Sequence, residues 1–400
     1  MKILMLTPYL PYPLHSGGQI RSYNLLKKLS ARHQITLFAL IKDDSERQYL
    51  PQLEKFCTKI RVFKRTFSPW HPKNILRAGF TLYPFVVTRN LVNETLEAVR
   101  EEIAADKYDL IHAETFYMMP NIPKTSIPVI LVEQTIEYLG YLNYASKNRF
   151  LPLKPFFWVD IFKIKWWEKH YWRTCNRLIT MSEDDKEFIK SICPDARPID
   201  VVANGVDTQW FDQVKKRLPP HPTLLFIGTF KWLPNVEAVD FLVGQVWPLI
   251  KKSVPGARLW IVGNSPTEKV FGYERSDPTI KVTGNIPDIR DAYSQAHILV
   301  APVFSGKGTR YKILEAMATG TPAVATSIAL EGFGIIPGRH ALIADTAPEM
   351  ADTIIRLLQD KKTQALLAKN GKEFVASRYD WKSISAKLDS VYQAVGRSQR

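Results

Sequence analysis

The sequence has few cysteines, no long apolar run and no leader-like start. Its 400 residues include three cysteines (Cys57, Cys175 and Cys193), whose spacing is not that of a metal site. So few cysteines are typical of a reducing compartment, and we expect a cytoplasmic protein. No apolar run reaches the roughly 20 residues that a membrane-spanning helix needs. The opening MKILMLTPYLPYP has a short apolar run that ends in prolines, which predicts a first strand and not a signal peptide.

Acidic residues are scarce relative to basic ones. Lys plus Arg number 54 and Asp plus Glu number 39, so the net charge is +15. This balance suits anionic partners, namely phosphate-bearing small molecules, nucleic acid or acidic lipid. The basic residues are not gathered in one tail, which disfavours a nucleic-acid-binding arm. Apolar residues make up 46% of the chain, which is enough for ordinary packed cores.

Apolar runs alternate with amphipathic stretches through the first half of the chain. The runs that we expect to be strands are 2–7, 35–41, 59–63, 109–114, 128–133, 178–182 and 199–205. Helical patterns separate them, including one expected near 85–105. This order predicts βαβ units, and hence a mostly parallel sheet with helices on both faces.

The same alternation begins again after a polar, proline-rich stretch. The later strands are expected at 223–229, 258–264, 280–285, 298–303, 322–327 and 341–345, with a helix at 235–252. We therefore predict two doubly wound α/β domains, divided as 1–205, a hinge at 206–222, 223–378 and a terminal segment 379–400. Ligands of such sheets bind at the carboxyl ends of strands, where the strand order reverses, which predicts a cleft between the domains.

The stretch SGKGTRYKILEAMATGTPAV (305–324) follows the expected strand 298–303. Gly306 and Gly308 let the backbone approach a ligand closely. A helix expected from about Thr309 directs its free N–H groups at the same point. Three basic residues add positive charge: Lys307, Arg310 and Lys312. Together these features predict a diphosphate site, with the Glu315 carboxylate placed to accept hydrogen bonds from a ribose diol.

The residues alone leave a second interpretation open. Glycine-rich turns after strands are common, so this segment also fits an ordinary loop and helix of an α/β domain. In that case Glu315 is a solvated residue paired with Lys312.

Several segments, in this order, resemble glycosyltransferase family 4, whose members are retaining enzymes with the GT-B fold. The segments are SGGQIRSYNLLKKLSARHQITLFAL, DLIHAE, MSEDDKEFI, VVANGVDTQWF, GTRYKILEAMATGTPAVAT and RYDWKSISAKLDSVY. More narrowly, they resemble the bacterial transferases of exopolysaccharide and surface-glycan assembly. The resemblance implies two Rossmann-like domains and a last helix, 379–400, that returns to the first domain.

The resemblance also implies roles for single residues. Glu315 matches the glutamate that holds the donor ribose. The expected diphosphate contacts are Gly308, Thr309, Arg310 and Tyr311. Gly17 and Gly18 match the first-domain loop that faces the phosphates, and His112 and Glu114 fall near the transferred sugar.

Three positions depart from the family pattern. Lys307 stands where a glutamate usually contacts the donor sugar, and Glu114 replaces the second histidine of a pair. The phosphate-binding arginine of the second domain is missing, with Lys231 nearby instead. These departures bear on the identity of the sugar and on the groups near the reacting carbon.

The expected reaction transfers a sugar from a nucleoside diphosphate sugar to a glycan or lipid-linked acceptor. Cations and oriented N–H groups stabilise the charge on the departing diphosphate, and we assign Lys307, Arg310 and Lys231 to this task. The sequence has no Asp-x-Asp motif, so we expect no metal and no cofactor. The resemblance implies retention at the anomeric carbon.

Alternatives accompany two of these residues. His112 lies on an apolar strand, where a histidine is more often a satisfied core residue. Glu114 ends that strand, so its carboxylate either faces the cleft or is paired.

The segment 154–173, KPFFWVDIFKIKWWEKHYWR, also has two interpretations. Its tryptophans and lysines suit a helix lying on an anionic membrane surface, which would place the protein on the inner face of the plasma membrane. The segment equally suits a long helix whose aromatic face is buried on the first sheet.

Two other functions stay open. A nucleotide-sugar epimerase of the same fold would release an altered sugar without an acceptor. A basic nucleic-acid-binding protein would place aromatic and basic residues along an exposed groove, and its binding would be salt-sensitive. Alternating buried strands disfavour the second, and no nucleic acid is expected as a partner.

Overall fold

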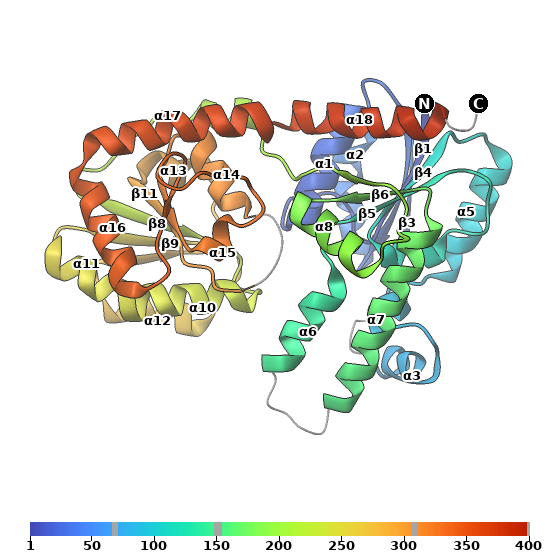
Figure 1. Cartoon of the computed structure of the whole chain (residues 1–400), viewed down its shortest axis with the longest axis horizontal. Coiled ribbons are helices and arrows are strands. Elements are labelled where there is room, and N and C mark those ends of the chain that lie inside the picture. Colours follow the sequence, from blue (N-terminus) through green and yellow to red (C-terminus); the bar gives the residue numbers. More distant parts are fainter. Residues whose placement is uncertain (66–70, 148–153, 306–309, 398–400) are drawn as a thin grey trace. The chain divides into compact units, whose positions relative to one another are not determined.

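A computed structural model of the chain describes residues 1–65, 71–147, 154–305 and 310–397. The chain divides into two compact units (Figure 1). The first holds residues 1–204 together with the chain from Ile384, and the second holds residues 205–383 as far as they are described. Within the described ranges, no helix is long and apolar enough to cross a membrane.

The first unit is built on a seven-stranded sheet in the order β3-β2-β1-β4-β5-β6-β7. The strands are β1 (Lys2–Thr7), β2 (Gln34–Ile41), β3 (Lys59–Lys64), β4 (Leu110–Glu114), β5 (Val129–Glu133), β6 (Arg177–Thr180) and β7 (Ile199–Val201). Every pair is parallel. The strand order therefore reverses between β1 and β4, which is where a doubly wound sheet binds its ligands.

Helices connect these strands and cover the sheet. They are α1 (Gly17–Leu29), α2 (Leu50–Glu54), α3 (Pro72–Phe80), α4 (Phe85–Thr88), α5 (Asn93–Ala105), α6 (Glu137–Lys147), α7 (Lys154–Thr174) and α8 (Glu183–Ile192), with short 3₁₀ turns at η1 (Asp44–Tyr49) and η2 (Phe116–Asn121). The last helix, α18 (Trp381–Arg397), belongs to this unit from Ile384 onward. Figure 1 shows α6 and α7 extending beyond the sheet, with α3 beside α7.

The second unit has a six-stranded parallel sheet in the order β10-β9-β8-β11-β12-β13. Its strands are β8 (Thr223–Ile227), β9 (Arg258–Val262), β10 (Ile280–Thr283), β11 (Ile298–Ala301), β12 (Ala323–Ala325) and β13 (Leu342–Ile343). The helices are α9 (Thr208–Asp212), α10 (Leu233–Phe241), α11 (Trp247–Ser253), α12 (Glu268–Ser276), α13 (Arg290–Gln295), α14 (Tyr311–Ala318), α15 (Ser327–Leu330), α16 (Ala347–Gln359) and α17 (Lys361–Arg378). Here the order reverses between β8 and β11.

The expected fold class, two doubly wound parallel sheets, is confirmed. Every apolar run that we expected to be a strand contains one, because strands covered on both faces are buried along their whole length. Leu4, Leu6 and Ile111 have almost no exposed surface and pack with Val99 of α5 in one core cluster. A second cluster packs Trp172 of α7 against Leu131.

Two expected helices are interrupted. The helix near 85–105 is two helices, because the Val92 N–H donates to Asn121 Oδ1 (3.0 Å) before α5 begins. The helix at 235–252 contains a π-helical turn, Leu242–Val246, directly before α11. Pro248 explains this break, since proline has no N–H to donate and its ring crowds the preceding turn.

Candidate active site

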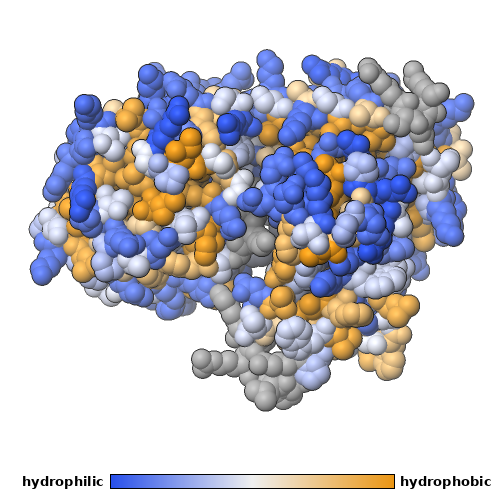
Figure 2. Space-filling view, viewed as in Figure 1, coloured by the Kyte–Doolittle hydropathy of each residue, from blue (hydrophilic) through white to orange (hydrophobic). Residues whose placement is uncertain are grey.

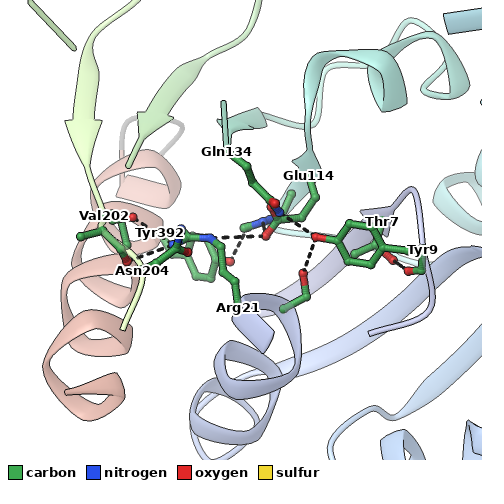
Figure 3. A network of polar contacts seen from close by, with 11 residues as sticks. Thr7, Tyr9, Arg21, Glu114, Gln134, Val202, Asn204 and Tyr392 are labelled. Carbon is green, nitrogen blue, oxygen red and sulfur yellow. Dashed lines mark hydrogen bonds and ion pairs between the residues drawn. The ribbon is translucent and has the colours of Figure 1, made fainter. Parts of the chain in front are cut away.

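A fully buried carboxylate, Glu114, ends β4 beside the reversal of the first sheet (Figure 3). Its Oε1 lies 3.1 Å from His112 Nε2, and its Oε2 accepts a hydrogen bond from Gln134 Nε2 at 2.6 Å. Arg21 Nε lies 3.9 Å from Oε1, so an ion pair completes the surroundings. Both halves of the carboxylate are therefore satisfied by groups from α1, β4 and the chain after β5.

His112 is buried and uses both of its ring nitrogens. Its Nδ1 lies 2.6 Å from the hydroxyl of Tyr392 on α18. A carboxylate only accepts hydrogen bonds, so in the neutral ring Nε2 donates to Glu114 and Nδ1 accepts from Tyr392. Of the two interpretations of His112, the structure matches the satisfied core residue. Glu114 is likewise paired and not exposed.

Arg21 links this cluster to residues 202–204, the segment that follows β7. Its Nη1 donates to the carbonyls of Val202 and Ala203 (both 3.0 Å) and to Asn204 Oδ1 (3.1 Å). The side chain is fully buried, so its charge needs the Glu114 carboxylate as a partner. Asn204 thus takes part in the network.

The half-buried members of this network are Tyr9 and Gln134. The Tyr9 hydroxyl accepts from Gln134 Nε2 (2.6 Å) and lies 3.2 Å from Ser22 Oγ. Gly18 lies directly against them: a Cβ at that position would be 2.5 Å from the Tyr9 hydroxyl and 2.8 Å from Gln134 Oε1. A Cβ there would push Tyr9 and Gln134 out of these positions, which gives a physical reason for the second glycine of the SGG sequence.

The surroundings of Glu114 set its charge state. Burial is the largest single effect and raises its pKa, but His112, Arg21 and Gln134 together outweigh it and leave the pKa below its ordinary value. Burial raises the pKa of Tyr9, and the nearby Glu114 charge adds to this shift. The cluster therefore holds an ionised carboxylate beside a neutral phenol.

In the second unit, Glu315 lies on α14, which follows β11. The carboxylate is half-buried, and its Oε2 accepts a hydrogen bond from the Tyr293 hydroxyl at 2.8 Å. Burial raises the pKa of Glu315, while Tyr293 and Lys312 oppose the shift. Glu315 is not the solvated partner of Lys312 that the alternative interpretation required, because Tyr293 holds it.

Lys312 turns away from Glu315. Its Nζ donates to Asn235 Oδ1 at 3.0 Å and lies 4.4 Å from the centre of the Phe226 ring. Burial, reinforced by the charge of Arg310, lowers its pKa to about 7. Lys312 is therefore only partly protonated near neutral pH, whereas the sequence led us to expect a full positive charge.

Arg310 is the residue directly before α14. It is half-buried, and burial lowers its pKa, against the opposing charge of Glu331. Its Nη2 donates to the Ser305 carbonyl at 3.4 Å. The helix itself begins at Tyr311, later than the expected start near Thr309.

Other predicted residues are placed as follows. Gly17 is the first residue of α1, and Ser16 caps that helix by accepting from Gln19 N–H. Lys231 lies exposed in the turn after β8. Lys307, Gly308 and Thr309 lie outside the described residues. Among the residues that the structure does describe, no three His, Cys, Asp or Glu side chains gather as metal ligands.

Sequence reasoning missed the residues that hold the two carboxylates. Tyr293 and Tyr392 are far from Glu315 and Glu114 in the chain, and no local pattern marks either of them. Arg21 carried a positional signal, because it lies one turn after the glycine pair.

Two doubly wound parallel sheets in one chain are the architecture of the GT-B glycosyltransferases. Sequence models of two families match the chain: Glycosyltransferase Family 4 over residues 15–210, and Glycosyl transferases group 1 over residues 221–360. The chain belongs to glycosyltransferase family 4, and it is a transferase enzyme.

Two relatives illustrate the range of similarity. A Klebsiella pneumoniae protein described as an uncharacterized 44.6 kDa protein in cps region is 21% identical over 97% of this chain and 98% of its own. The phosphatidyl-myo-inositol mannosyltransferase of Mycobacterium tuberculosis H37Rv is 26% identical over 49% of this chain and 54% of its own, so this match spans about half of each protein.

Solved structures share the fold at low sequence identity. Sucrose-phosphate synthase from Thermosynechococcus elongatus aligns with a TM-score of 0.75 at 18% identity, over the whole of both chains. Anabaena HepE in complex with UDP-glucose aligns with a TM-score of 0.66 at 16% identity, over 98% of this chain and all of its own. At such identities the likeness establishes the fold.

The depressed pKa of Lys312 predicts how stability changes with pH. An unfolded lysine titrates near pH 10.4, whereas folded Lys312 titrates at about 7. Between these values the unfolded chain binds more protons, so this group makes the free energy of unfolding rise with pH. Lys312→Met removes the burial cost, and we expect the variant to exceed wild type in stability near pH 7 and to lose that advantage towards pH 10.

Urea unfolding at several pH values measures this effect. Lys369→Met is the matched control, because Lys369 is exposed in the same unit. Equal pH dependence in Lys312→Met and wild type would show that Lys312 stays charged throughout.

Proposed function

We propose that the chain transfers a sugar from a nucleoside diphosphate sugar to a glycan or lipid-linked acceptor, with retention and without a metal. The observation that carries this proposal is Glu315, a half-buried carboxylate held by Tyr293 on the helix that follows β11. A carboxylate fixed in this way accepts two hydrogen bonds from a vicinal diol such as ribose. The UDP-glucose bound by the Anabaena structural neighbour supports a nucleotide-sugar donor here.

The donor diphosphate is assigned to the basic residues near the start of α14. Arg310 stands directly before the helix, and Lys312 lies one turn from Glu315. A diphosphate would raise the pKa of Lys312 by charge attraction, so Lys312 takes up a proton as the donor binds. Lys307, Gly308, Thr309, Tyr311 and Lys231 remain the sequence-based candidates for the other diphosphate contacts, and Gly17 and Gly18 for the contacts made by the first unit.

Glu114 is proposed as a positioning residue. It is fully buried, and its partner Gln134 is half-buried and bonds the half-buried Tyr9. An ionised Glu114 orients the Gln134 amide, which in turn donates to the Tyr9 hydroxyl. His112 contacts the other carboxylate oxygen of Glu114, Oε1. With no nucleophile assigned, retention would follow from attack on the same face, with the donor phosphate accepting the acceptor's proton.

Screening followed by a transfer assay tests the function. Thermal shift with UDP-, GDP-, ADP- and TDP-sugars identifies the donor, and transfer to saccharide and polyprenyl-linked acceptors is then assayed with EDTA present. We expect a glycosylated product that retains the anomeric configuration of the donor. Release of an altered nucleotide sugar without any acceptor would support the epimerase instead, and a requirement for added metal would contradict the metal-free reaction.

Glu315→Ala is expected to weaken binding of the nucleoside diphosphate. Loss of hydrogen bonds to a charged group costs about 1.5–3 kcal/mol, so the dissociation constant should rise at least about tenfold. The fold should persist, because the Tyr293 hydroxyl keeps the Lys312 carbonyl as a partner at 3.1 Å. Calorimetric titration measures the affinity, and Glu373→Ala, an exposed residue of α17, is the control. Unchanged affinity in Glu315→Ala would refute the ribose assignment.

Glu114→Gln is expected to lower kcat more than it weakens donor binding. The variant keeps the shape of the side chain but removes the charge that orients Gln134 and pairs with Arg21. Stability should also fall, by about 1–3 kcal/mol, because the Arg21 charge stays buried. Steady-state kinetics separate kcat from KM, and Glu101→Gln, an exposed residue of α5, is the control. A kcat equal to that of wild type would leave Glu114 with a structural role alone.

We further propose that the protein binds the inner face of the plasma membrane through α3 and α7. Part of α7 is buried as one interpretation required, with Ile161, Ile164 and Trp172 in the core. The opposite face is exposed, and Figure 2 shows apolar residues gathered in the region of α3 and α7. The exposed apolar side chains of this surface are Ile75, Leu76, Phe80, Leu82, Phe156, Trp158, Val159, Phe162 and Trp166.

The charges of this surface suit anionic lipid. Phe80 is 88% exposed and Phe162 is 69% exposed, and Lys163 joins their helices by donating to the carbonyls of Ala78 and Thr81 (2.5 and 2.7 Å). The acidic residues of the described helices α3 and α7, Asp160 and Glu168, are buried, whereas four basic side chains are exposed: Lys73, Arg77, Lys165 and Arg173. An aromatic surface with exposed cations and buried acids is typical of a helix lying in a lipid interface.

Liposome flotation tests this proposal. We expect the protein to float at low salt with vesicles of phosphatidylcholine plus phosphatidylglycerol, and less with phosphatidylcholine alone. Combining Phe80→Ser with Phe162→Ser should reduce binding at least about tenfold, because each aromatic ring contributes about 1.5–3 kcal/mol when buried. Ile328→Ser with Leu366→Ser, two exposed apolar residues of the second unit, is the control. Equal flotation of both double variants would remove α3 and α7 from the contact.

A further inference from the structure

Two arginines of the first unit lie near the same edge of the sheet, and no carboxylate among the described residues is bonded to either. Arg65 directly follows β3, and Arg89 directly follows α4. Both side chains are half-buried, and the Nε atom of each is buried without a hydrogen-bond partner in the part of the chain that the structure describes. Neither arginine was singled out by its sequence, and neither belongs to the network around Glu114.

The two positive charges act on each other. Burial lowers the pKa of Arg65 to about 10, and the next largest cause is the charge of Arg89. The Arg65 guanidinium donates to the Pro8 carbonyl. Within the described ranges, no side chain or carbonyl accepts a hydrogen bond from the guanidinium of Arg89.

Two carboxylates lie near the arginines, but neither is bonded to them within the described ranges. Glu46 and Tyr117 lie within electrostatic range of Arg65, and Glu137 and Tyr141 within range of Arg89. Burial raises the pKa of Glu137, and Thr135 and Arg89 oppose this shift. Burial also raises the pKa values of Tyr117 and Tyr141, which keeps both phenols neutral.

This cluster adjoins the half-buried end of the Glu114 network. Tyr117 lies in η2, directly after β4, and Tyr9 lies within electrostatic range of it. The Arg65 guanidinium reaches the carbonyl of Pro8, the residue before Tyr9. The arginines therefore lie at the carboxyl ends of the strands, on the same side of the sheet as Gln134 and Tyr9.

A half-buried pair of guanidinium groups without a bonded carboxylate is costly unless an anion joins it. Arginine presents a fork of N–H donors that matches the oxygens of a phosphate or a carboxylate. We propose that Arg65 and Arg89 bind an oxyanion carried by the acceptor saccharide, either a phosphate ester or a sugar carboxylate. This proposal rests on the proposed function, since it names a property of the acceptor.

Calorimetric titration with three small probes tests the site. The probes are glucose 1-phosphate, methyl glucuronide and the neutral methyl glucoside, each with the nucleotide identified by screening present at saturation so that the donor site is filled. We expect one or both charged probes to bind wild-type protein at least about tenfold more tightly than methyl glucoside. The probe that binds more tightly identifies phosphate or carboxylate as the source of the oxyanion.

Substitutions assign the binding to the arginines. Arg65→Gln and Arg89→Gln should each weaken binding of the charged probe at least about tenfold, whereas Arg100→Gln, an exposed arginine of α5, should not. Arg89→Gln removes no hydrogen bond that the structure describes, so its folding should be unaffected. If Arg65→Gln proves unstable, Arg65→Lys replaces it as the test variant, because it keeps the positive charge. This variant should bind the charged probe with intermediate affinity, because lysine lacks the forked N–H donors of arginine.

Two results would overturn the proposal: equal affinity for charged and neutral probes in wild type, or unchanged affinity in both arginine variants. Failure of the proposed function is distinguishable from either result. If no nucleotide binds at all, the titrations without nucleotide still report whether the oxyanion depends on Arg65 and Arg89.

Discussion

The buried charge of Glu114 is the constraint on which the first unit depends. A carboxylate without exposed surface must be matched by donors and a cation, and here the matching groups come from separate parts of the chain. Arg21 supplies the cation from α1, Gln134 supplies an amide after β5, and His112 transmits the contact to Tyr392 of α18. Satisfying this one group therefore fixes the first helix, the central strands and the last helix with respect to one another.

Most of the fold could be predicted from the sequence, because parallel strands buried on both faces appear as continuous apolar runs. The run 109–114, for example, contains β4 with all five residues buried. Helix continuity was less predictable. The break before α5 depends on a bond from Val92 to Asn121, which is distant in the chain, although the π-turn before α11 carried a local signal in Pro248.

The candidate site was only partly predictable. Motif resemblance pointed to Glu114 and Glu315, because each ends or follows a strand where ligands bind. It could not show that Tyr293 holds Glu315, or that Lys312 turns to Asn235 and has a pKa near neutrality. Those properties depend on burial and on contacts between distant residues, which no local spacing encodes. The proximity of Arg65 and Arg89 could not be predicted either, because no sequence pattern links these two residues.

The bond between Tyr392 and His112 makes the end of the chain an internal component of the first unit. α18 also supplies Asp389, which bonds Arg32 and His33 of the segment after α1 (2.8 and 3.0 Å). Proteolytic trimming of the tail before Asp389 would thus remove hydrogen-bond partners of His33 and of His112, the residue that contacts Glu114. Loss of this part of α18 is therefore expected to loosen the packing around the central strand β4, which is distant from it in the sequence.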